Sequence, residues 1–254
     1  MSTSIIACRV ASYAPFEERA YEHLAGLGLR YVEIPVPQPR AVEATCTVLA
    51  RYGLSASSLH GECDLRRPDV AARVEAQMSA FAALGARLLF VSAKAENVLL
   101  QTAYDRLRAA GDAAAAHGVT IILETHPDLV TNAAVALATM QGVDHPNVRI
   151  NFDTANIYFY NHGVDCVAEL RRIVKYVAAT HLKDTDGGYR NWYFPALGRG
   201  VVPFQEIFAL LDQAGFSGPC TIEIEGIEGE TKTEQLVRDR IAESVAFLRR
   251  LGRL

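Results

Sequence analysis

The feature that most constrains the fold is a short β-branched run that recurs eight times, each run separated from the next by a segment of helical periodicity. Strands that alternate with helices form parallel sheets through βαβ units. Eight such units in 254 residues is the count of a (β/α)8 TIM barrel. We therefore predict an α/β fold in which residues 1–254 form a single TIM-barrel domain. The runs are SIIACRV (4–10), RYVEIPV (30–36), LSASSLH (54–60), RLLFVSA (87–93), VTIILETH (119–126), VRINFDT (148–154), YVAATHLKD (176–184) and CTIEIEG (220–226).

The segments between the runs carry apolar residues at helical spacing, such as Val74, Met78 and Phe81. A glycine that follows such a segment predicts a left-handed helix end, as at Gly53 and Gly85. An open doubly wound sheet is the competing fold. Its nucleotide-binding version has no support, because no GxGxxG or GxxxxGK[ST] loop follows the first strand.

Composition excludes several classes of function. The formal net charge is −4 and the seven histidines are scattered, so no basic surface for nucleic acid or an anionic membrane is indicated. No segment reaches the roughly 18 apolar residues that span a bilayer, and the first residues lack the basic and apolar regions of a signal peptide. We therefore predict a cytoplasmic protein. The five cysteines show no CxxC spacing and are predicted to be free thiols.

Polar side chains gather where the predicted strands end. In a barrel of this type the carboxyl ends of the strands converge on one mouth, where catalytic groups lie. Ionised carboxylates at such positions are costly unless they are paired or bound to a metal. The polar residues are Glu33, His60, Ser92, Lys94, Glu124, His126, Asp153, Asn156, His181, Lys183, Asp184, Glu223 and Glu225.

Three carboxylates and one histidine on four consecutive strands indicate a metal centre. A divalent cation would remove the repulsion among Glu124, Asp153 and Glu223, and a neutral His181 would complete a mixed oxygen and nitrogen set. Such a set suits Mn²⁺, Mg²⁺, Co²⁺ or Zn²⁺. A hydrogen-bonded polar mouth without an ion is the alternative at this point.

Five motifs in order extend this interpretation: ILETH, NFDTAN, THLKD, LGRGVVPF and GFSGPCTIEIE. Together they resemble the xylose-isomerase-like barrel family of sugar isomerases and epimerases, which includes ketose 3-epimerases, inosose dehydratase and an endonuclease branch. The resemblance implies one divalent ion, with Mn²⁺ the first choice, held by Glu124, Asp153, His181 and Glu223. Counting from Gly218, the family's spacing selects Glu223 over Glu225 as the last ligand. The endonuclease branch is disfavoured, because this chain lacks its many histidines and basic face.

Two glutamates from strands three apart in the ring suit a proton transfer between two bases. We predict that Glu124 and Glu223 remove and return a proton next to a carbonyl, while the ion stabilises the enediolate as a Lewis acid. The expected activity is therefore isomerisation or epimerisation of a keto-sugar or polyol. The residues predicted to contact this substrate are Glu33, His60, His126, Asn156, Lys183 and Arg199.

Several of these residues have a structural alternative. His126 could instead cap the loop that begins at Pro127, and Lys183 could pair with a carboxylate. Asp184 is expected to orient the loop after the seventh strand. The aromatic residues of that loop, 187–200, could cover a sugar or form a contact in a homo-oligomer.

Two departures from the family's ketose 3-epimerases keep other reactions open. Those enzymes carry a histidine three residues after the metal aspartate and an arginine shortly after the metal histidine. Here the first position is Asn156, and the nearest arginine after His181 is Arg190. A metal-dependent lyase or dehydratase acting on an inosose-like or 3-keto-glycoside substrate is therefore the main alternative. A barrel that binds a sugar or a partner subunit without catalysis is a third.

Overall fold

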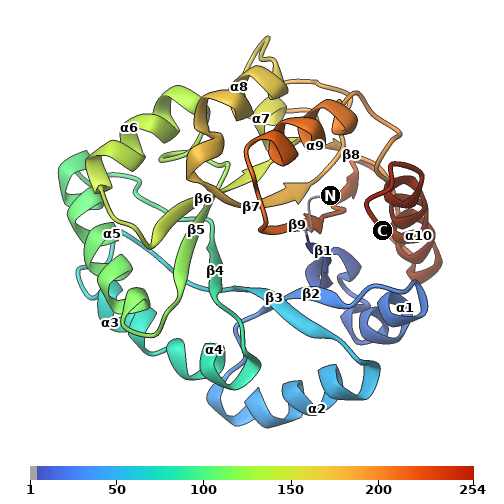
Figure 1. Ribbon diagram of the computed structural model, residues 1–254, viewed down its shortest axis with the longest axis horizontal. Helices are drawn as coiled ribbons and strands as arrows, with labels where there is room; N and C mark the ends of the chain where they lie inside the picture. Colours follow the sequence, from blue (N-terminus) through green and yellow to red (C-terminus); the bar gives the residue numbers. More distant parts are fainter. Residues whose placement is uncertain (1–4) are drawn as a thin grey trace.

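The computed structural model describes residues 5–254 and shows a closed parallel barrel surrounded by helices (Figure 1). Its eight strands pair in the order β1-β2-β3-β4-β5-β6-β7-β9, and β9 closes the ring by pairing with β1. The predicted (β/α)8 barrel is confirmed. The strands are β1 (Ile5–Arg9), β2 (Tyr31–Pro35), β3 (Ser55–His60), β4 (Leu88–Val91), β5 (Thr120–Glu124), β6 (Val148–Asp153), β7 (Val177–Leu182) and β9 (Pro219–Ile222).

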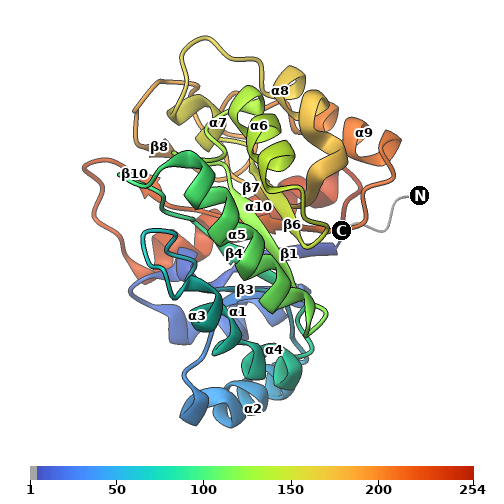
Figure 2. The ribbon, with the colours of Figure 1, turned by 90° about the vertical axis from the view of Figure 1, so that its left-hand side faces the viewer.

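Seven of the predicted runs each contain one barrel strand, whereas the last run only overlaps its strand, which begins at Pro219. The run 220–226 is predicted as one strand, but β9 ends at Ile222 and the chain then leaves the barrel. A separate short strand, β10 (Gly226–Ile227), pairs antiparallel with β8 (Tyr193–Phe194), which lies in the loop after β7. Figure 2 shows β8 and β10 side by side, outside the ring of parallel strands. These two loops are therefore joined above one end of the barrel.

The helices pack around the outside of the barrel (Figure 1). Gly53 and Gly85 end α2 and α4 with φ of 64° and 67°, as predicted. The stripe through Val74, Met78 and Phe81 is buried as expected, but it is divided between two helices, α3 and α4. The helices are α1 (Ala20–Gly26), α2 (Val42–Tyr52), α3 (Val70–Glu75), α4 (Met78–Leu84), α5 (Leu100–Ala115), α6 (Ala133–Val143), α7 (Asn156–Phe159), α8 (Cys166–Ile173), α9 (Phe204–Gln213) and α10 (Glu234–Arg250), with 3₁₀ turns at Val10–Tyr13, Glu17–Arg19, Pro39–Ala41 and Val174–Tyr176.

The main core lies between the outer faces of the strands and the helices. A second, small apolar cluster of Phe90, Ile122 and Ala179 fills the inside of the barrel. The Phe90 ring lies 4.4 Å from the ring of His181, measured between centroids. The inner cluster therefore forms an apolar floor beneath polar groups at the carboxyl end of the strands.

Some sequence predictions stay predictions. Residues 1–4 lie outside the described part of the chain, and this includes Ser4, the first residue of the first predicted strand. That residues 1–254 form one domain stays a prediction. Within residues 5–254 no helix has the length and apolarity needed to cross a bilayer.

Asp184, shortly after β7, organises the long loop that carries β8. Its Oδ1 accepts hydrogen bonds from the amides of Thr185 at 2.9 Å and Val202 at 3.2 Å, and its Oδ2 accepts from Gly198 and Gly200, both at 2.8 Å. The carboxylate is fully buried, and a Cβ on Gly200 would lie 2.1 Å from the carbonyl oxygen of Thr185. One side chain thus satisfies four backbone donors and ties the two ends of the loop together.

We expect Asp184→Ala to lower the free energy of unfolding by about 3 kcal/mol, because buried amides lose their acceptor. Urea denaturation followed by circular dichroism measures this change, and fluorescence of Trp192, the single tryptophan, reports on the loop. Asp186→Ala is the matched control, since this exposed carboxylate of the same loop bonds Gly188 and Asn191. Equal destabilisation by both substitutions would contradict the anchoring role of Asp184.

Candidate metal centre

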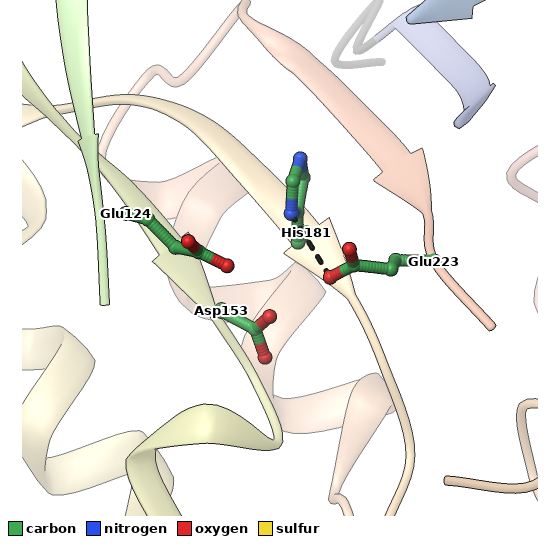
Figure 3. Close-up of side chains that lie close together, drawn as sticks. All are labelled: Glu124, Asp153, His181 and Glu223. Atoms are coloured by element: carbon green, nitrogen blue, oxygen red, sulfur yellow. Dashed lines mark hydrogen bonds and ion pairs between the residues drawn. The ribbon is translucent and has the colours of Figure 1, made fainter. Parts of the chain in front are cut away.

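Four side chains from neighbouring strands converge at the carboxyl end of the barrel (Figure 3). Glu124 ends β5, Asp153 ends β6, His181 lies in β7, and Glu223 directly follows β9. One ligand atom of each lies within 4.8 Å of those of the other three. The barrel therefore brings together the four residues that the sequence predicts as metal ligands.

Asp153 is held through one oxygen, and its other oxygen faces the cluster. Its Oδ1 accepts hydrogen bonds at 2.8 Å from the amides of Ala155 and Asn156, at the start of α7. Its own amide donates to Thr125 Oγ1 at 3.0 Å. The buried Oδ2 accepts no hydrogen bond from residues 5–254. Burial raises the pKa of this carboxyl to about 7, although nearby Lys183 acts to lower it.

Glu124 is only partly buried, and its partners are neutral groups. Ser92 Oγ donates to Oε2, and Asn156 Nδ2 donates to Oε1 at 3.2 Å. The same Asn156 amide donates to the carbonyl oxygen of Thr125 at 3.1 Å. Asn156, which the sequence predicts to contact substrate, therefore positions the Glu124 carboxylate.

His181 lies fully buried between two carboxylates. Its Nδ1 is 3.2 Å from Glu223 Oε2, and its Nε2 is 3.2 Å from Glu33 Oε2. Burial alone lowers the pKa of the imidazole, but the two carboxylates outweigh burial and raise it to about 10. A carboxylate on the far nitrogen of a metal-binding histidine fixes the ring's orientation and tautomer. Glu33 is placed for that task when Nδ1 serves as the ligand.

The predicted contact of Glu33 with substrate hydroxyls does not fit its position. The residue is 1% exposed, and Ser58 Oγ donates to its Oε2 at 2.8 Å. Arg9 lies 3.5 Å from its other oxygen, Oε1. Burial acts to raise the pKa of Glu33, but His181 and Arg9 outweigh burial, so the pKa lies below its usual value. The inward position of Glu33 agrees with its predicted place at the mouth, but its depth is not predicted.

Arg9 is a residue of the centre that the sequence analysis does not predict. It ends β1, where its Nη1 lies 3.1 Å from Glu223 Oε1 and its Nη2 lies 3.3 Å from His60 Nδ1. Its guanidinium also sits 5.0 Å from the centre of the Phe90 ring. The available signal was a charged residue at the end of an apolar strand, the same signal that identified Glu33.

Lys183 lies inside the cluster and is 2% exposed along its side chain. Its Nζ is 2.8 Å from Glu225 Oε2, 2.9 Å from Glu223 Oε2 and 3.1 Å from Asp153 Oδ2. Glu225 thus has a cation as its partner. Burial acts to raise the pKa of Glu223, but Lys183, Arg9 and His181 hold it well below its usual range.

The remaining predicted substrate contacts, His60, His126 and Arg199, have partners within the protein. His60 faces Arg9, and burial together with that guanidinium lowers its pKa to about 4. His126 Nδ1 donates to the carbonyl oxygen of Pro127, which matches its structural alternative. Arg199 is exposed and pairs with Glu243 of α10, so the structure does not bring it to the cluster.

An aromatic wall stands beside the cluster. Trp192 lies 5.1 Å from Phe194 and 5.9 Å from Phe159, measured between ring centroids, and Lys183 Nζ lies 4.9 Å from the centre of the Phe194 ring. Trp192 is 42% exposed. A cavity of about 140 Å³ lies beside Trp192 and Glu223, and its lining also includes Arg9, Glu225 and Lys232.

The donor set fits a divalent ion. Three carboxylates and an imidazole are ligands that divalent metals of the Mg²⁺ to Zn²⁺ range accept. Asp153 supports this fit, because Oδ1 is fixed by two amides while the buried Oδ2 faces the other ligand atoms with no hydrogen bond and only the Lys183 ammonium, 3.1 Å away, as an ionic partner. The four residues could therefore bind one metal ion.

Known proteins show both sequence and fold similarity to this chain. It is 30% identical over 139 residues to the L-ribulose-5-phosphate 3-epimerase UlaE of Salmonella paratyphi C, an alignment that covers 54% of this chain and 47% of the relative. The chain thus spans about half the length of the curated relatives it matches.

Solved structures extend the fold similarity over nearly the whole chain. A D-psicose 3-epimerase from Clostridium cellulolyticum H10 aligns with a TM-score of 0.78, 16% identity and 99% coverage of both chains. An L-ribulose 3-epimerase gives 0.77 at 19% identity, covering 98% of this chain and 94% of its own. The probable 3-DHS dehydratase AsbF of Bacillus anthracis gives 0.73 at 16% identity, with coverage of 96% and 98%. These TM-scores establish a shared fold.

A sequence profile decides the family. The profile of the xylose isomerase-like TIM barrel matches residues 21–251, which includes all four residues of the candidate metal centre. This agrees with the resemblance carried by the motifs at the ends of strands five to eight. The chain belongs to the xylose isomerase-like TIM barrel family.

Proposed function

We propose that this protein is a divalent-metal-dependent isomerase or epimerase of keto-sugars or polyols that moves a proton next to a carbonyl. The observation that carries this proposal is the opposition of Glu124 and Glu223, which point toward one another across the ligand cluster (Figure 3). Their strands, β5 and β9, are separated in the ring by β6 and β7. Two carboxylates on opposite sides of a bound substrate can accept a proton on one side and supply one on the other.

Glu124, Asp153, His181 and Glu223 would hold the ion, with Mn²⁺ the first choice and Mg²⁺, Co²⁺ or Zn²⁺ the alternatives. A divalent ion at this position would act as a Lewis acid that polarises the substrate carbonyl and acidifies the neighbouring C–H bond.

The protein's own residues divide the remaining work. Ser92 and Asn156 orient the Glu124 carboxylate through neutral hydrogen bonds, which leaves its charge available for a proton. Arg9 fixes the Oε1 oxygen of Glu223. The wall formed by Phe159, Trp192 and Phe194 provides an apolar surface beside the cluster, suited to one face of a sugar ring and to the exclusion of water.

A metal-dependent lyase or dehydratase is the second candidate, and a specific observation favours keeping it. The Asn156 side chain is committed to Glu124 and the Thr125 carbonyl, and Arg190 is exposed beside Tyr189. At these two positions the chain thus brings neither a histidine nor an arginine to the cluster. Loss of a leaving group from the next carbon would follow the same first proton removal. A non-catalytic barrel is the third reading.

We expect the purified protein with Mn²⁺ to incorporate solvent deuterium into its substrate from a panel of ketoses, ketose phosphates, inososes and 3-keto-glycosides. Mass spectrometry of the recovered compound measures this, and loss of water or of an aglycone identifies a lyase. Glu124→Gln and Glu223→Gln should each slow exchange by about 10³-fold. Glu206→Gln, on the exposed face of α9, is the control. The proposed chemistry is contradicted if exchange persists in both variants, or if none of the compounds in the panel exchanges with solvent.

We further expect saturating Mn²⁺ to stabilise the EDTA-treated protein by about 3 kcal/mol at a concentration near 100 times Kd. Differential scanning calorimetry measures the shift in Tm. Asp153→Asn should abolish most of the shift, because the amide cannot supply the charged ligand oxygen. Asp112→Asn, an exposed change on α5, should leave it intact. A shift of the same size in the Asp153 variant would exclude Asp153 as a ligand.

A further inference from the structure

The sequence contains four lysines, and Lys183 is the one that the fold buries. Its ammonium group contacts three carboxylates, of which Asp153 and Glu223 belong to the candidate ligand set and Glu225 does not. A buried ammonium is costly unless carboxylates compensate its charge. The chain therefore places a permanent cation on two of the carboxylates that a metal ion would use.

We propose that Lys183 sets the metal affinity of this centre, by competing with the ion for the charge of Asp153 and Glu223, and that Glu225 is the partner that retains the ammonium when the ion draws on the other two. This inference rests on the proposed metal centre and concerns its affinity, beyond the reaction it supports.

Distances and charge decide the direction of the effect. The Lys183 ammonium lies 3.1 Å from Asp153 Oδ2 and 2.9 Å from Glu223 Oε2, so a dication bound by the same two carboxylates would be close to it. Like charges at such a separation repel strongly where water is excluded. Each carboxylate also divides its attraction between the two cations. Lys183 therefore weakens metal binding while it keeps the neighbouring carboxylates from repelling one another.

Glu225 makes this arrangement tolerable when both cations are present. Its Oε2 forms the shortest contact with the ammonium, at 2.8 Å, and its side chain is 33% exposed, against 4% for Glu223. Glu225 is not one of the four candidate ligands, but it lies within reach of Lys183. The ammonium consequently keeps a full counter-charge even when the ion claims Asp153 and Glu223.

Lys183→Met tests the competition directly. We expect it to bind Mn²⁺ about tenfold more tightly than the wild type in calorimetric titration, because the competing charge is gone. The EDTA-treated variant should also melt at a lower temperature, since its carboxylates lose a counter-charge, and Mn²⁺ should restore more of its Tm than in the wild type. Lys175→Met is the control, because this exposed lysine packs over Tyr176 in the turn before β7. Unchanged or weaker Mn²⁺ binding by Lys183→Met overturns the proposal.

A double-mutant cycle with Glu225→Gln tests the retaining role, and it does not depend on the folding of one variant. In the wild-type background Glu225→Gln should weaken Mn²⁺ binding several-fold, because Lys183 then relies on the ligand carboxylates alone. In the Lys183→Met background the same change should have little effect. Equal losses in the two backgrounds overturn the retaining role of Glu225. A wild-type protein without saturable Mn²⁺ binding would refute the metal centre itself, whereas saturable binding with an unchanged Lys183→Met refutes only the competition.

Discussion

The concentration of negative charge at one end of the barrel is the constraint around which the site is built. Carboxylates cannot be buried together unless cations, hydrogen bonds or a metal compensate their charge. Here compensation comes from three residues: Arg9 at the end of β1, His181 in β7 and Lys183 directly after β7. The carboxylates that share this space are Glu33, Glu124, Asp153, Glu223 and Glu225.

Both the barrel and the cluster of four candidate ligands can be predicted from the sequence, because the same runs show where strands lie and which polar residues stand at their ends. Apolar runs mark the strands, and a polar residue at the end of such a run indicates that the strand end faces a polar site. Glu124, Asp153 and His181 each follow several buried residues of their strand. Parallel pairing of adjacent strands then converts separate positions into one cluster, as in the register of Asp153 with His181.

Ring closure and depth escape this reasoning. Arg9 is adjacent to Glu223 only because β1 pairs with β9, with Cys8 opposite Ile222, and pairing between the two ends of the chain leaves no local signal. Glu33 points inward as predicted, yet its depth depends on how His181 and Arg9 pack over it. Arg199 lies in an irregular loop, where no periodicity predicts the direction of a side chain. It pairs with Glu243 of α10 instead of reaching the cluster.

The surroundings of the two opposed glutamates differ in a way that bears on mechanism. Glu124 receives hydrogen bonds from Ser92 and Asn156, both neutral, and is partly exposed to the mouth. Glu223 is buried among Arg9, His181 and Lys183. Surrounding cations stabilise the ionised form of a carboxylate and reduce its tendency to take up a proton. In the proposed two-base proton transfer the two glutamates would therefore work in different surroundings, because cations surround Glu223 whereas the hydrogen-bond partners of Glu124 are neutral.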